Sequence, residues 1–134
     1  MEQDNAIAAD IVTIHTPATL GTHELVLLHG QPGSPADWVP LAGRLPAHFH
    51  AVAADRPGYG SSRQAAAGFA ANARAMLADL DSRGVKRAVL VGHSYGGGVA
   101  LAASLTLRRV AAVVLVASVG PGCVTGWDKL LAGR

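Results

Sequence analysis

The chain has 134 residues, half of them apolar and 15% charged, which suits one globular domain with a core and excludes a disordered chain. Eleven basic and nine acidic residues leave a formal net charge of +2, and the basic residues are scattered, so nucleic-acid binding has little support. The single cysteine excludes an internal disulfide and any zinc or iron–sulfur site built from cysteines.

The N-terminal stretch MEQDNAIAADIV is acidic and lacks the basic head and apolar run of a signal peptide. The longest nearly uncharged apolar stretch, residues 110–119, has about half of the roughly 20 residues that a membrane span needs. The sequence therefore predicts a cytoplasmic protein without a membrane span.

The first predicted elements are two short strands and a helix. Residues 10–15 are rich in β-branched side chains, and residues 24–28 form an apolar run that leads into the loop sequence HGQPGSP. Residues 37–45 are predicted to form a helix. Asp37 is its expected N-cap, and Pro40 falls in the first turn, where the missing N–H costs nothing.

The rest of the chain alternates between strands and helices. Strands are predicted at residues 51–54, 88–91 and 110–117, and helices at residues 64–82 and 94–105. The resulting order β-β-α-β-α-β-α-β predicts a single α/β domain over residues 1–134, with a mostly parallel sheet flanked by helices on both faces. Right-handed crossovers then gather the loops HGQPG, DRPGYG, GHSYG and SVGPG at one edge of the sheet, where open α/β sheets place their sites.

The sequence VLVGHSYGGGVAL holds the most specific local pattern, Gly92-x-Ser94-x-Gly96. This pattern is typical of a nucleophile elbow, in which a serine sits on a tight strand-to-helix turn at positive φ. Side chains two residues before and after the serine would collide with the turn, so glycine suits both positions. A glycine-rich turn with an incidental serine is the alternative. The sequence has no G-x-G-x-x-G or P-loop pattern, so no cofactor is expected.

These loops together resemble the α/β-hydrolase family. That family carries His-Gly after its third strand, a D-x-x-G-x-G-x-S-like turn after the fourth and G-x-S-x-G after the fifth. Here the matching stretches are LLHGQPGS, ADRPGYGSS and VGHSYGGG, in the same order, and the likeness runs from about residue 24 to residue 120. The esterase, lipase and cofactor-free haloperoxidase-like branch is the most similar.

The resemblance implies a role for three residues. Ser94 would be the nucleophile, and the backbone N–H groups of Gln31 and Tyr95 would form the oxyanion hole. The substrate would be a small-molecule carboxylic ester or a similar acyl compound. The HGQP sequence is also similar to epoxide hydrolases and haloalkane dehalogenases, but those enzymes carry aspartate at the elbow.

Other polar residues near these loops have simpler interpretations. His29 is expected to brace its own loop rather than act as a base, and His93 to line the pocket or pack. Asp55 and Arg56 are expected to fix the turn after the strand at residues 51–54, with Asp55 as catalytic acid a second choice. Ser61 and Ser62 suit turn or capping positions.

The catalytic acid and histidine of the family are not found in this sequence. Family members usually have about twice this length and place both residues after later strands. After Ser94 the chain has one acid, Asp128, and no histidine. The resemblance therefore implies a hydrolase truncated after about the sixth family strand, without the cap and the last two strands. Completion in trans by another polypeptide, or a non-catalytic remnant that binds ligands or assembles, are the alternatives.

Truncation has a consequence for the strand at residues 110–117. Its outer edge would be unpaired, in an apolar run without charge, proline or glycine. Such an edge pairs readily with another chain. We therefore expect self-association or aggregation of the isolated chain and low stability.

Overall fold

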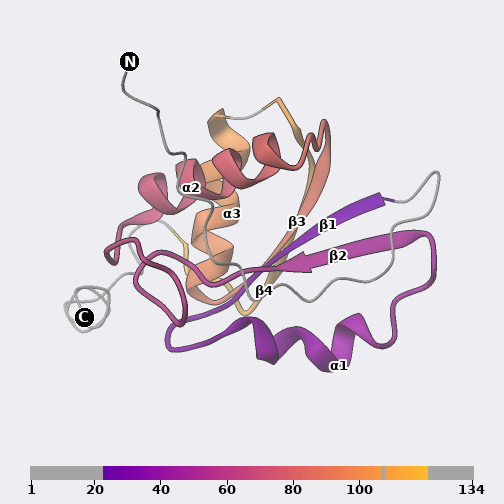
Figure 1. Ribbon diagram of the computed structural model, residues 1–134, viewed down its shortest axis with the longest axis horizontal. Coiled ribbons are helices and arrows are strands. Elements are labelled where there is room, and N and C mark those ends of the chain that lie inside the picture. Colours follow the sequence, from indigo (N-terminus) through magenta and orange to yellow (C-terminus); the bar gives the residue numbers. More distant parts are fainter. Residues whose placement is uncertain (1–22, 107, 121–134) are drawn as a thin grey trace, which may run out of the picture.

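The computed structural model describes residues 23–106 and 108–120 (Figure 1). The strand expected at residues 10–15 and the tail from residue 121 lie outside the described residues. In chain order the described elements are three helices, one short 3-10 helix and four strands.

The four strands form one parallel sheet in the order β2-β1-β3-β4. Their bounds are His23–Leu28 for β1, Phe49–Ala53 for β2, Ala88–His93 for β3 and Val110–Val116 for β4. Each lies within two residues of its predicted position at both ends. The parallel α/β architecture predicted from the sequence is confirmed.

Helices cover both faces of this sheet, as expected (Figure 1). The 3-10 helix Pro35–Trp38 and α1 (Val39–Ala42) lie on one face, and α2 (Phe69–Ser82) and α3 (Tyr95–Thr106) lie on the other. Side chains of β1 alternate between two cores, since Val26 packs toward α2 and α3 and Leu27 toward Trp38.

The first helix begins earlier than predicted and has a different N-cap. Ser34, not Asp37, caps it: the Ser34 hydroxyl accepts a hydrogen bond from the N–H of Ala36, and the Asp37 carboxylate accepts one from the N–H of Ser34 over 3.0 Å. Asp37 is thus the third residue of a capping box. Pro40 does fall in the first turn of α1.

The second helix begins at Phe69, five residues later than predicted. The carbonyl oxygen of Ala67 accepts hydrogen bonds from the Asn72 amide at 2.6 Å and from the Tyr95 hydroxyl at 3.2 Å. The carbonyl oxygen of Gln64 accepts one from the N–H of Gly58. These contacts hold residues 64–68 as a loop, although three successive alanines favour a helix.

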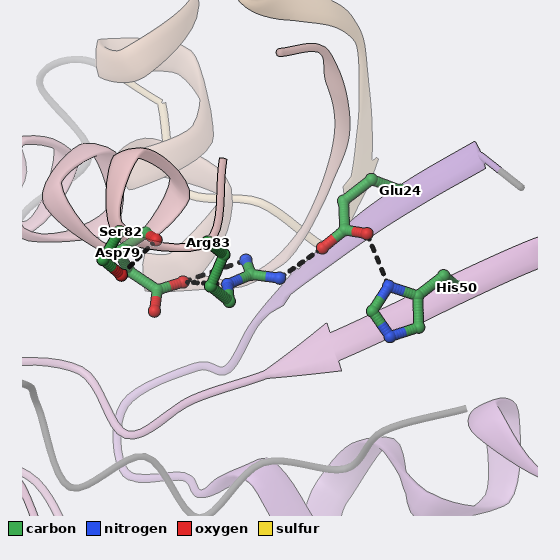
Figure 2. A network of polar contacts seen from close by, with 5 residues as sticks. All are labelled: Glu24, His50, Asp79, Ser82 and Arg83. Carbon is green, nitrogen blue, oxygen red and sulfur yellow. Dashed lines mark hydrogen bonds and ion pairs between the residues drawn. The ribbon is translucent and has the colours of Figure 1, made fainter. Parts of the chain in front are cut away.

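A network of charged residues ties the end of α2 to the start of the sheet (Figure 2). Glu24 on β1 contacts His50 on β2 at 2.5 Å and also pairs with Arg83, which in turn contacts Asp79 at 2.9 Å. Since the strands are parallel, this network lies at their amino ends, away from the loops that follow β1 and β3. It anchors the helix rather than forming part of the site.

Candidate active site

Ser94 occupies the turn between β3 and α3. Its φ is 50°, which confirms the positive φ that the elbow pattern predicts. The N–H of Ser94 donates to the carbonyl oxygen of Val116 at 3.0 Å, and its own carbonyl oxygen accepts from Gly97 and Val119 at 3.0 and 3.2 Å. The backbone of Ser94 is therefore hydrogen-bonded to the end of β4 and the residues after it. Ser94 itself is partly exposed.

Nearby backbone atoms leave no room for a side chain at either glycine of the pattern. A Cβ on Gly92 would lie 2.5 Å from the carbonyl oxygen of Gly96, and a Cβ on Gly96 would lie 2.2 Å from the carbonyl oxygen of Leu28. A side chain can change rotamer to relieve such a clash, but backbone atoms in a sheet or a helix cannot move in this way. Glycine at both positions therefore lets α3 begin directly against the end of β1.

The His-Gly loop lies beside the serine. A Cβ on Gly30 would lie 3.2 Å from the Cβ of Ser94 and 2.9 Å from Nδ1 of His93. Gln31 follows Gly30 in the chain, and Tyr95 is the first residue of α3. The structure thus brings together the three residues that the sequence singles out, at the carboxyl edge of the sheet.

His29 is fully buried and braces its loop. Its Nδ1 lies 2.9 Å from the carbonyl oxygen of Gly30, and its Nε2 accepts a hydrogen bond from the backbone N–H of Arg56 at 3.1 Å. These two contacts require the proton on Nδ1. Burial lowers the pKa of His29 below its ordinary value, so the ring stays neutral. With both nitrogens engaged, His29 is not placed to take a proton from Ser94.

Asp55 holds the turn after β2. Its carboxylate accepts hydrogen bonds from the N–H of Ser61 at 2.8 Å and from the Ser61 hydroxyl at 3.0 Å. Gly60, at a φ of +51°, lies so close that a Cβ there would meet the same carboxylate. The structural role expected for Asp55 is confirmed.

A protein-family model, described as the alpha/beta hydrolase family, matches residues 25–134. The chain belongs to the alpha/beta hydrolase family.

Several known proteins are similar to the chain over much of its length. It is 38% identical over 105 residues to the dihydrolipoyllysine-residue acetyltransferase component of an acetoin cleaving system from Pseudomonas putida, a match that covers 76% of this chain and 28% of that protein. A thermophilic esterase from Thermogutta terrifontis is 28% identical, with a TM-score of 0.70, over 83% of this chain and 46% of the esterase. A hydrolase from Pseudomonas aeruginosa PA01, 23% identical, shares the fold with a TM-score of 0.74 over 92% of this chain and 52% of its own. The chain thus spans about a quarter to a half of the length of these relatives.

In this alpha/beta hydrolase, Arg56 and Asn72 are polar residues whose contacts the sequence did not predict. They are only 3% and 2% exposed, and Arg56 donates to the Asn72 amide oxygen at 3.3 Å. Arg56 also reaches the loop after β1, 26 and 27 residues earlier in the chain. A signal for Asn72 was available, since it is a polar residue next to Ala73 and Met76 on the buried side of α2.

A cavity of about 50 Å³ lies between the sheet and α2. Its lining includes Val26, Met76 and Val99 together with Asp55, Arg56 and Asn72. Ser94 does not line it. The cavity is therefore not the place where a substrate would meet the serine.

The described residues can also be compared with the requirements of a membrane span and of a metal site. No helix in the described part of the chain is long and apolar enough to cross a bilayer. The described residues also hold no group of three or more His, Cys, Asp or Glu side chains arranged to bind a metal ion.

Proposed function

We propose that this chain carries the nucleophile and oxyanion hole of a serine hydrolase that acts on a carboxylic ester or a similar small acyl substrate. Ser94 is the nucleophile, and the N–H groups of Gln31 and Tyr95 stabilise the oxyanion. The observation that carries the proposal is the position of Ser94, at positive φ between β3 and α3 and beside Gly30, where an added Cβ would lie 3.2 Å from that of Ser94.

The proposed chemistry is acyl transfer to the serine. The Ser94 oxygen attacks the carbonyl carbon, and negative charge develops on the carbonyl oxygen. Two backbone donors and the amino end of α3 favour that charge, and each donor is worth about 3 kcal/mol of barrier. As the intermediate collapses, the ester C–O bond breaks and the leaving oxygen takes up the proton that Ser94 gave up, which releases the alcohol and leaves an acyl-serine that water then hydrolyses.

We assign no residue of this sequence as the acid or the histidine that would carry the serine proton. Asp128 is the only acid after Ser94, and no histidine follows it. His29 is engaged by Gly30 and Arg56. A serine hydroxyl without an adjacent base is a weak nucleophile, so we expect little or no turnover from the isolated chain. We propose that the acid and histidine are supplied from outside these residues.

Labelling with an aryl fluorophosphonate at pH 9, followed by intact mass and peptide mapping, tests the nucleophile. At this pH hydroxide can take the serine proton, so slow phosphonylation of Ser94 is expected. Ser94→Ala should abolish the label. Ser104→Ala is the matched control, because that hydroxyl on α3 donates to the carbonyl oxygen of Leu101 in the same helix.

Two results would contradict the proposal. Labelling that persists in Ser94→Ala would assign the nucleophile to another residue. Rapid turnover of a short-chain aryl ester by the pure chain would show that a base is present, and His29→Asn would then be the first variant to examine.

A non-catalytic assembly module is the alternative function. It is favoured by three successive apolar residues on the outermost strand, Val114, Leu115 and Val116, which are 43–46% exposed. An absence of phosphonylation at Ser94 together with a defined oligomer would favour this alternative over the hydrolase.

A further inference from the structure

Arg56 joins the turn after β2 to the loop beside Ser94. Its Nε donates to the carbonyl oxygen of His29 at 3.0 Å, and its Nη2 donates to that of Gly30 at 2.8 Å. The backbone N–H of Arg56 also donates to Nε2 of His29. One buried residue therefore makes three hydrogen bonds to two consecutive residues of the His-Gly loop.

The guanidinium of Arg56 also contacts two tyrosine rings. Its central carbon lies 4.6 Å from the centroid of the Tyr59 ring and 4.7 Å from that of the Tyr95 ring. The Tyr95 hydroxyl donates to the carbonyl oxygen of Ala67, and the Tyr95 ring packs on Phe69 at 4.5 Å between centroids. Arg56 thus contacts both segments that would supply oxyanion donors, the His-Gly loop and the start of α3.

The bond to Gly30 fixes the orientation of one peptide plane. The C=O and N–H of a trans peptide point in opposite directions within that plane. With the carbonyl oxygen of Gly30 held by Arg56, the N–H of Gln31 must point to the side away from Arg56. If this peptide turned over, it would present its oxygen in place of its N–H and would destabilise an oxyanion.

We propose that Arg56 is a positioning residue that locks the Gly30–Gln31 peptide in the orientation required for the oxyanion hole. This inference rests on the proposed function, in which the N–H of Gln31 is an oxyanion donor. The guanidinium donates to three neutral oxygens, so these contacts do not cancel its charge, which adds positive potential beside the same peptide.

The test compares two reactions of one nucleophile in the full chain carrying Ser94→Cys and Cys123→Ser. A thiolate is a few per cent populated at neutral pH and attacks without a general base. With p-nitrophenyl acetate, the sulfur attacks the carbonyl carbon through an oxyanion, p-nitrophenolate leaves with the ester C–O electron pair, and a thioester remains. With iodoacetamide, the sulfur displaces iodide from a saturated carbon, and no oxyanion forms.

Arg56→Met is expected to slow acylation by about tenfold or more while iodoacetamide alkylation keeps its rate, because only acylation needs the hole. Arg56→Lys retains the charge but lacks the rigid fork of donors that holds the two carbonyls, so its acylation rate should fall between those of the parent and Arg56→Met. Arg74→Met, at an exposed position on α2, is the matched control and should change neither rate.

Each other outcome overturns the inference. If Arg56→Met leaves acylation unchanged, Arg56 does not position the donor, and the proposed function stands. If it slows both reactions equally, with a lowered thermal midpoint by circular dichroism, its role is in folding alone. If the parent Ser94→Cys chain is alkylated but not acylated, the oxyanion hole itself is refuted, and the proposed function fails with it.

Discussion

Two residues of the site, Gly96 and His29, are defined by their immediate surroundings. Gly96 has no room for a side chain, because the end of β1 passes directly over it. His29 has both ring nitrogens in hydrogen bonds inside the protein. Each of these two environments leads to a prediction about the stability of the chain.

Gly96→Ala should lower the free energy of unfolding by at least about 2 kcal/mol, because the new methyl would lie 2.2 Å from the carbonyl oxygen of Leu28. Urea denaturation followed by circular dichroism measures this. Gly68→Ala is the matched control, since a Cβ there meets nothing within 4 Å, and its effect should not exceed about 1 kcal/mol. Equal effects of the two substitutions would show that α3 does not pack on β1 as described.

The chain should lose stability as the pH falls below about 6.5, the ordinary pKa of the histidine that burial lowers at position 29. In this range His29 binds a proton in the unfolded chain but stays neutral in the folded one. Each pH unit therefore lowers the free energy of unfolding by at most about 1.4 kcal/mol. Above that pH both states are neutral at this residue, and its effect vanishes. The thermal midpoint should therefore fall between pH 7.5 and pH 5.5.

His29→Asn should flatten this pH dependence, while His48→Asn, at an exposed position, should leave it in place. Thermal melts of the three proteins at both pH values provide the comparison. If the midpoint of the unsubstituted chain does not change between the two pH values, His29 is not buried in its neutral form.

Among the elements, β4 has the least protected surroundings. It is the outermost strand of the sheet and pairs only with β3 in the described part of the chain. The side chains of Val114, Leu115 and Val116 are 46%, 46% and 43% exposed. Their apolar surface and the free backbone edge favour pairing with a further strand.

The isolated chain should therefore associate at micromolar concentration, as judged by light scattering and sedimentation velocity. Val114→Lys should reduce the association, because a charge at an exposed edge disfavours strand pairing. Leu41→Lys, at a position that is 39% exposed on α1, should have no such effect. A monodisperse monomer of the unsubstituted chain, or equal effects of both substitutions, would contradict this prediction.

At the scale of the whole molecule, the chain matches only part of the length of the solved structures that it resembles. It covers 46% of the esterase from Thermogutta terrifontis that it resembles. The described residues include the serine turn and the loop that Arg56 braces. Under the proposed function, these residues supply the attacking hydroxyl and the two oxyanion donors.

Adding the downstream half of a related esterase in trans should then raise both solubility and ester hydrolysis. The added strands would cover β4, and the added histidine would take the proton of Ser94. Hydrolysis should vanish when the same complex is made with Ser94→Ala. A soluble complex of unsubstituted chain and partner that remains inactive would separate assembly from catalysis and would count against the assignment of Ser94.

The sequence alone determined the parallel strands, their limits within two residues and the positive φ of Ser94. These features depend on local properties, namely apolar runs of strand length and a turn that only glycine permits on either side. The sequence also indicated that His29 and Asp55 brace their loops, because both follow buried strands.

Only the tertiary structure decided the start of α2 and the reach of Arg56. Helix propensity favours residues 64–68 as helix, yet the Tyr95 hydroxyl, 28 residues away, binds a carbonyl that a helix would require. The sequence predicts that Arg56 fixes its own turn, but its side chain also bonds to a loop 26 residues earlier. Such contacts depend on how distant segments are brought together by the sheet, and no local pattern of residues encodes them.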